Sequence, residues 1–94
     1  MDSSLHCFII SYDLCSPQKS YDELYEVIKS FPNWGHLTES TWAVVSTDSF
    51  IEVRDKLLKV MDPNDRLFVI QSGRSAAWSN VLAEDEWVKQ NVVL

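Results

Sequence analysis

Asp13 is the residue best placed for chemistry, because it closes the mostly apolar run 5–14 (LHCFIISYDL). Aromatic and β-branched residues dominate this run and Ser16-Pro17 follows it, which predicts a buried strand. A carboxylate at the end of a buried strand lies at the rim of the sheet, where it can reach solvent, a metal ion or a partner subunit. The alternative is a structural role, in which the carboxylate accepts hydrogen bonds from amides of the following loop.

Basic and aromatic side chains that could contact a nucleic acid are few. Arg66 and Arg74 flank the last predicted strand and are the best candidates for a phosphate contact. A solvated ion pair with one of the many carboxylates is the alternative for both. Aromatic side chains can stack on bases, but without interleaved Lys and Arg we favour packing for the tryptophans, Trp34, Trp42, Trp78 and Trp87.

The charge of the chain argues against a nucleic-acid surface. The net charge is −6 over 94 residues. Residues 1–48 carry two basic and seven acidic side chains (net −5), residues 49–74 carry five and four (net +1), and residues 75–94 carry one and three (net −2). No segment forms the basic stripe with which nucleic-acid binders contact phosphates.

Length and composition indicate one folded domain over residues 1–94. The apolar fraction of 46% fits a globular domain and not a disordered chain. No apolar stretch approaches the roughly 18 residues that cross a bilayer. The N-terminus has no basic region, so we expect neither a signal peptide nor a membrane partner.

The two cysteines bear on the compartment. Cys7 and Cys15 are eight residues apart, which is about 26 Å on an extended segment at about 3.3 Å per residue. A disulfide needs Cα atoms within about 7 Å. We therefore expect free thiols and a cytoplasmic location, unless a tight turn brings Cys15 back over the strand.

Two helices are predicted from periodicity and capping signals. Ser20 and Glu23 have the spacing of a capping box, as do Ser49 and Glu52. The first helix then shows one apolar stripe, made of Tyr21, Leu24, Tyr25, Ile28 and Phe31. A third, terminal helix is predicted over residues 84–91, with acidic residues at its start, where the helix dipole favours them.

Three further strands complete the pattern. Residues 34–48 predict two short strands with a tight turn near Glu39-Ser40, and residues 66–71 predict the last strand. The order β-α-β-β-α-β predicts an α+β fold of the ferredoxin-like, split-βαβ kind. Its core would span residues 5–73, with a C-terminal helical extension over residues 74–94.

Both faces of the predicted sheet carry apolar side chains. In the first strand, Phe8, Ile10 and Tyr12 alternate with Cys7 and Ile9. The last strand divides in the same way, with Phe68 and Ile70 opposite Leu67 and Val69. Two helices cover only one face, so we expect a second copy of the chain on the other face. The alternative cover is the C-terminal extension, folded back over the sheet of a monomer.

The segment 9–14 (IISYDL), in a β-α-β-β-α-β chain of this length, resembles the small metal-dependent nuclease of CRISPR adaptation modules. That family includes virulence-associated protein D and the SinR-type small proteins. The second half is most similar to the SinR-type branch, through the segments 40–42 (STW), 64–67 (NDRL) and 76–79 (AAWS). The resemblance covers roughly residues 5–80.

This resemblance implies a homodimeric endonuclease of RNA or DNA. The two copies of Asp13 would face a common cleft and hold Mg²⁺ or Mn²⁺, while Tyr12 and Ser11 would shape the site. The chain departs from the nuclease pattern in residues 18–23 (QKSYDE), where the family carries several basic residues and this chain has one. It also departs at its C-terminus, where a helix is predicted in place of a swapped strand.

A second interpretation comes from the charge. A compact, acidic dimer suits a non-catalytic module that binds or inhibits a basic protein partner. The position of Asp13 favours the nuclease, whereas the charge balance favours the interaction module. Both interpretations stay open from the sequence.

Overall fold

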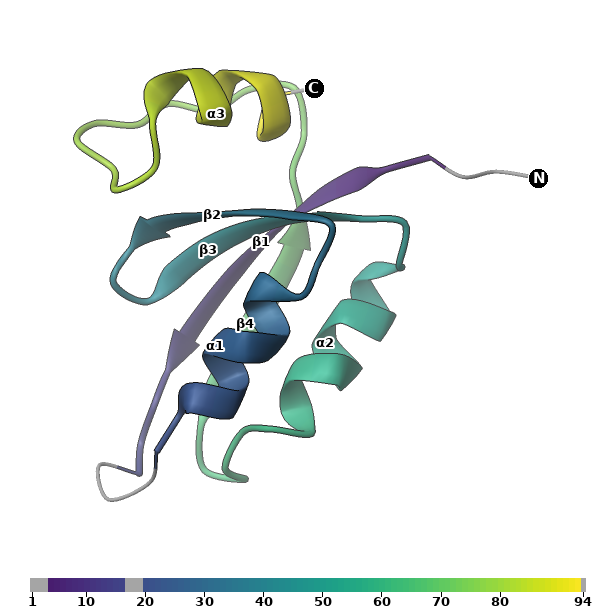
Figure 1. Cartoon of the computed structure of the whole chain (residues 1–94), viewed down its shortest axis with the longest axis vertical. Helices are drawn as coiled ribbons and strands as arrows, with labels where there is room; N and C mark the ends of the chain where they lie inside the picture. Colours follow the sequence, from purple (N-terminus) through teal and green to yellow (C-terminus); the bar gives the residue numbers. More distant parts are fainter. Residues whose placement is uncertain (1–3, 17–19, 94) are drawn as a thin grey trace.

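The computed structural model describes residues 4–16 and 20–93. It is a small α+β structure, in which one four-stranded antiparallel sheet has the strand order β2-β3-β1-β4. Helices α1 and α2 lie on one side of the sheet and α3 on the other (Figure 1). The elements are, in chain order, β1 (His6–Asp13), α1 (Asp22–Lys29), β2 (Asn33–Thr38), β3 (Thr41–Ser46), α2 (Phe50–Leu58), β4 (Arg66–Gln71) and α3 (Asp85–Asn91).

Strand β1 lies inside the sheet, between β3 and β4. Ile9 pairs with Ala43 of β3 on one side and with Ile70 of β4 on the other. At the end of β1, Asp13 pairs with Arg66 at the start of β4. β2 and β4 are therefore the edge strands, and Asp13 lies at the rim of the sheet, as predicted.

The helix side of the sheet carries the main core. Phe8, Ile10 and Tyr12 of β1 are buried there against α1 and α2. The apolar stripe predicted for α1 is confirmed, since Leu24 and Ile28 are fully buried. Other buried members of this core are Phe31, Trp42, Val44, Val53, Leu57 and Met61.

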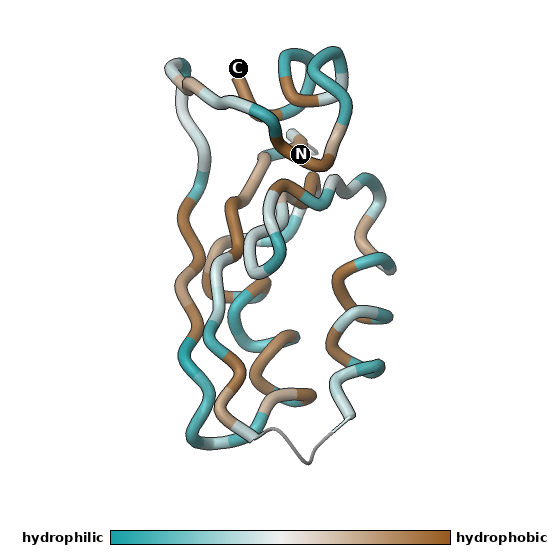
Figure 2. The backbone as a smooth tube through the Cα atoms, turned by 90° about the vertical axis from the view of Figure 1, so that its left-hand side faces the viewer, coloured by the Kyte–Doolittle hydropathy of each residue, from teal (hydrophilic) through white to brown (hydrophobic). Residues whose placement is uncertain are grey.

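The second side of the sheet has a smaller core, built with the C-terminal segment. Cys7, Ala43 and Val45 are buried there beneath Val88 and Val92. Before α3, the Leu82 amide donates a hydrogen bond to the carbonyl of Leu37 in β2 (2.9 Å). Figure 2 shows apolar residues along the strands as well as on the helices, as a sheet that is buried on two sides requires.

This second core stops short of β4. Phe68 and Ile70 point to the second side and remain 63% and 51% exposed, whereas Leu67 and Val69 pack against the helix-side core. The described residues therefore cover the second face over β1, β2 and β3 and leave it open over β4. We call the open part, made of Phe68 and Ile70, the β4 patch.

The two predicted capping boxes have different outcomes. The box at α2 is confirmed: Ser49 Oγ accepts from the Glu52 amide (3.2 Å) and Glu52 Oε1 accepts from the Ser49 amide (2.8 Å). The box between Ser20 and Glu23 is wrong, because α1 begins at Asp22 with Tyr21 as its N-cap and no side-chain capping bond. Glu23 is thus the second helical residue and not the third, which the capping box requires.

The remaining local predictions agree with the structure. The hairpin turns at Glu39-Ser40, and the terminal helix begins at Asp85, one residue later than predicted. Cys7 and Cys15 are both free thiols, the first buried and the second exposed. Within residues 4–16 and 20–93, no helix is long and apolar enough to cross a membrane.

Gly35 in β2 permits a close approach between the C-terminal segment and the sheet. A Cβ atom at this position would lie 2.5 Å from Cζ3 of Trp87. The indole cannot move away freely, because its Nε1 donates to Asn33 Oδ1 (3.1 Å). We expect Gly35→Ala to lower the free energy of unfolding by about 1–3 kcal/mol, the usual cost of overpacking, in urea denaturation.

Gly73→Ala is the matched control. No atom lies within 4 Å of a Cβ at Gly73, and neither glycine has a positive φ. Its free energy of unfolding should stay within about 0.5 kcal/mol of wild type. Equal stability of the two variants would show that Trp87 does not pack on Gly35.

Candidate site at the rim of the sheet

Asp13 presents an accessible carboxylate. Its side chain is 68% exposed, and Oδ2 lies 3.7 Å from Nη1 of Arg66, whose side chain is 75% exposed. An ion pair of this length between exposed side chains contributes little stability. A cation or a partner could therefore replace Arg66 beside Asp13 at small cost.

The alternative for Asp13 was that it accepts hydrogen bonds from amides of the loop after β1, but another carboxylate has this role. Within the described residues, the Asp13 carboxylate has the Arg66 ion pair and no hydrogen bond from the following loop. Asp65 accepts those bonds instead: Oδ1 from the Cys15 amide (2.7 Å) and the Tyr21 hydroxyl (2.8 Å), and Oδ2 from the Asp62 amide (2.8 Å). Asp65 thus joins the end of β1, the start of α1 and the turn before β4.

Three of the other predicted site residues lie beside Asp13. Ser11, Tyr12 and Arg66 line a shallow hollow of about 150 Å³ with Asp13 and with Phe68 of the β4 patch. Ser11 pairs with Phe68 across the two strands. The hollow therefore connects the carboxylate with the open apolar face.

Tyr12 lines the hollow because of its place in β1, but its hydroxyl is not available there. Its side chain is turned to the helix side, where the hydroxyl accepts a hydrogen bond from Trp42 Nε1 (2.9 Å). Burial raises the pKa of Tyr12 above its ordinary value, in spite of this hydrogen bond. The hydroxyl therefore stays neutral at physiological pH, which suits packing and not proton abstraction.

Arg74 is not part of the site. β4 runs antiparallel to β1, so that Arg66 lies beside Asp13 while Gln71 lies beside Phe8. The Ser72 amide then donates to the Cys7 carbonyl (2.8 Å). Arg74 follows at that far end of β1, and only Arg66 of the two candidate phosphate contacts is near Asp13.

Sequence reasoning missed Glu39 and Tyr25. Both line a second hollow of about 520 Å³, which also borders Asp13 and Tyr12. The Tyr12 amide donates to the Ser40 carbonyl (3.1 Å), which holds the β2–β3 turn beside the end of β1. The signal was present, because a turn at Glu39-Ser40 must lie near the end of β1 once β3 pairs antiparallel with it.

The aromatic residues near this second hollow mostly pack on one another. The His36 ring stacks on Trp42, with centroids 3.9 Å apart and an interplanar angle of 9°. His36 Nε2 also lies 3.2 Å from the Glu39 carbonyl oxygen. This contact leaves His36 poorly placed to act as a general base. Trp34 also packs against Trp42, with ring centroids 5.7 Å apart, but it lies at the sheet edge and stays 38% exposed.

Across 4–16 and 20–93, no three or more His, Cys, Asp and Glu side chains come together as metal ligands. Mg²⁺ and Mn²⁺ need only one or two carboxylates when water and phosphate oxygens complete the shell. Asp13 fits such a role, with a second carboxylate supplied from elsewhere.

Comparison with known proteins assigns the chain to no family. No family model matches the sequence, and neither a curated protein nor a solved structure is similar enough to count as a match. The function therefore has to be inferred from the residues and their geometry.

Removing the Asp65 carboxylate should weaken the contacts between the end of β1, the start of α1 and the turn before β4. Asp65→Ala deletes the acceptor of three hydrogen bonds from three separate segments. We expect the free energy of unfolding to fall by about 1–3 kcal/mol, because partly buried donors lose their partner. Urea denaturation, with amide hydrogen exchange at Cys15 and Asp62, measures both effects.

Asp55→Ala serves as the control, since it removes an aspartate whose carboxylate makes an exposed ion pair. Asp55 pairs with Arg54 at 2.9 Å, but both side chains are 53% exposed. This variant should remain within about 0.5 kcal/mol of wild type. An Asp65→Ala variant as stable as Asp55→Ala would contradict the role given to Asp65.

Proposed function

We propose that the chain forms a homodimer through the β4 patch, and that the dimer hydrolyses phosphodiester bonds of RNA or DNA. In this proposal, Mg²⁺ or Mn²⁺ is held between the two copies of Asp13. The observation that carries it is the position of Asp13: its accessible carboxylate borders the one part of the second sheet face that the described chain leaves open.

The arrangement of the elements supports a ferredoxin-like assignment. The order β-α-β-β-α-β followed by α3, and the strand order β2-β3-β1-β4, agree with the split-βαβ pattern. On this assignment, residues 74–93 form a C-terminal extension that covers part of the second face. The extension covers part of the face on which a second copy was expected. The proposed dimer interface is therefore confined to β4 and the adjoining part of β1.

The β4 patch has the character of a self-association surface. Phe68 and Ile70 are large, apolar and more than half exposed, and β4 is an edge strand. Exposed apolar patches mark interaction sites, and a two-fold interface uses the same patch on both copies. Because Ser11 and Asp13 follow Ile9 on this side of β1, packing patch on patch brings the two Asp13 carboxylates toward a common axis.

The proposed chemistry uses few protein groups. Asp13 would hold the metal ion, which would lower the pKa of a bound water and neutralise charge on the phosphate. The water attacks phosphorus, the P–O bond to the leaving oxygen breaks, and a proton passes to that oxygen. Arg66 is placed to bind a phosphate oxygen, because its guanidinium is exposed beside Asp13.

One observation favours the second candidate, a non-catalytic interaction module. Besides Arg66, no Lys or Arg among the described residues borders either hollow at Asp13, and the chain carries a net charge of −6. A surface of this charge repels nucleic acid and attracts a basic protein. The two candidates share the dimer and differ in whether Asp13 performs chemistry.

Cleavage should depend on Asp13 and on a divalent ion. We expect the wild-type chain to cleave single-stranded or duplex RNA or DNA with Mg²⁺ or Mn²⁺ and not with EDTA. Asp13→Asn should lower the rate by at least about 100-fold, the usual effect of removing a catalytic group. A gel assay with fluorescent oligonucleotides measures the rate.

Asp55→Asn, purified in the same way, controls for contaminating nucleases and should cleave like wild type. Cleavage that persists in Asp13→Asn, or its absence over a range of substrates, ions and pH, would contradict the nuclease proposal. If no cleavage is found, a dimer that binds a basic protein partner would favour the interaction module.

The dimer can be tested separately. Light scattering should give a mass near twice the 10.8 kDa of one chain, and Phe68→Glu should give a monomer, because it places a charge in the interface. Phe50→Glu is the control: Phe50 is 54% exposed on α2, on the other side of the sheet. A monomeric wild type, or a dimer that survives Phe68→Glu, would remove the paired site.

A further inference from the structure

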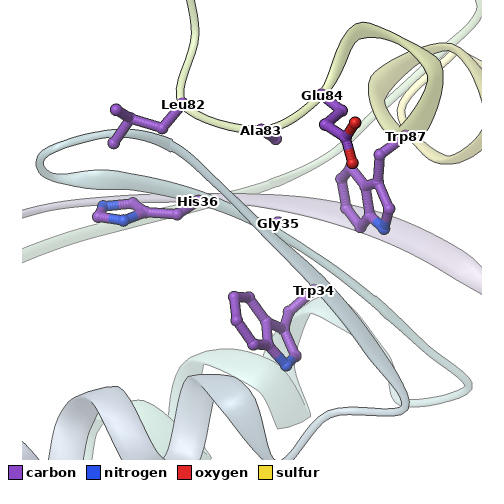
Figure 3. A pocket seen from close by; sticks show the side chains of 7 residues that line it. All are labelled: Trp34, Gly35, His36, Leu82, Ala83, Glu84 and Trp87. Atoms are coloured by element: carbon purple, nitrogen blue, oxygen red, sulfur yellow. The ribbon is translucent and has the colours of Figure 1, made fainter.

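A separate hollow lies where the edge strand β2 meets the segment that leads into α3. Its volume is about 300 Å³, and Trp34, Gly35, His36, Leu82, Glu84 and Trp87 line it (Figure 3). It shares none of its lining residues with the two hollows at Asp13. Its size is at the lower end of the range for small-ligand sites.

Two indoles lie on opposite sides of β2 at Gly35, and the Trp87 ring packs directly on this glycine. Figure 3 shows Trp34 on one side of the strand and Trp87 on the other, with Glu84 directed toward the Trp87 ring. Trp87 is held in place, because its Nε1 donates to Asn33 Oδ1 (3.1 Å) and its carbonyl accepts from Asn91 Nδ2 (2.9 Å). A ligand therefore meets at least one indole that needs no reorganisation.

The carboxylate of Glu84 lacks a partner among the described residues. It makes no hydrogen bond to cap α3 and no ion pair, whereas its neighbour Asp85 accepts from Trp78 Nε1 (3.2 Å). The ammonium of Lys29 lies 5.4 Å from the Trp34 centroid, but Lys29 does not line the hollow. The hollow thus combines π faces and one unpaired negative charge.

We propose that this hollow binds a weakly hydrated organic cation, specifically a trimethylammonium group. Indole faces attract such a cation, and desolvation strengthens the attraction, while Glu84 supplies the opposite charge. A bare divalent metal ion needs more oxygen ligands than one carboxylate. An anion would be repelled by Glu84 and by the net charge of −6.

The same chemistry is offered by two sources, a free small molecule such as choline and a trimethylated lysine side chain. The probe for the first is choline chloride, and its neutral isostere 3,3-dimethylbutan-1-ol isolates the charge. We expect the Trp34 and Trp87 indole N–H resonances to shift saturably with choline. The dissociation constant should be on the order of 1–10 mM, since so few atoms supply little binding energy.

Two exposed side chains at the hollow can be changed, Glu84 and Trp34, although Trp34 also packs against Trp42 of the helix-side core. Glu84→Gln should weaken choline binding about three- to fivefold, the contribution of one exposed ion pair. Trp34→Leu should weaken it by about two- to fivefold, through loss of an exposed cation–π contact. Glu86→Gln, which removes the same charge from α3 outside the lining of the hollow, should bind like wild type.

Three outcomes would overturn the proposal. These are no saturable shift up to about 100 mM choline, an equal response to the neutral isostere, or equal weakening by Glu84→Gln and Glu86→Gln. A lysine-trimethylated peptide that binds more tightly than both choline and its unmethylated form would identify a protein source. Asp13→Asn should leave choline binding unchanged, so this test is independent of the proposed nuclease.

Discussion

The structure depends on one constraint: β1 is apolar on both faces and lies inside the sheet, so it must be covered twice. Phe8, Ile10 and Tyr12 bury one face under α1 and α2, and the residues around Val88 and Val92 bury the other. A segment of this length covers β1, β2 and β3 but not β4. How far this second cover reaches decides which part of the second face stays exposed.

At the rim of the sheet, two acidic residues have different roles. Asp65 accepts the hydrogen bonds that join the loop after β1 to α1 and to the turn before β4. Asp13 is left with an exposed carboxylate and a weak ion pair to Arg66. A group that stabilises a fold is saturated with partners, whereas a group available for binding is not. This contrast, more than sequence position, makes Asp13 the candidate ligand.

The C-terminal segment has two effects on the surface. It covers the second face over β1, β2 and β3 and leaves the β4 patch exposed. It also brings Glu84 and Trp87 to the edge of β2, where Trp34 stays exposed. One packing requirement therefore creates both the restricted apolar patch and the aromatic hollow, on separate parts of the molecule.

Much of the fold was predictable from local patterns, because periodicity reports directly on which side of a strand or helix is buried. The alternation along β1 and β4, the stripe of α1 and the capping box of α2 were all determined by neighbouring residues. The start of α1 was not, since Tyr21 bonds to Asp65, 44 residues away. Tertiary structure alone decided that Glu39 lies near Asp13, that Arg74 lies far from it and that the C-terminal segment leaves β4 open. These facts depend on contacts between distant segments and on how much surface each covers, which no local pattern records.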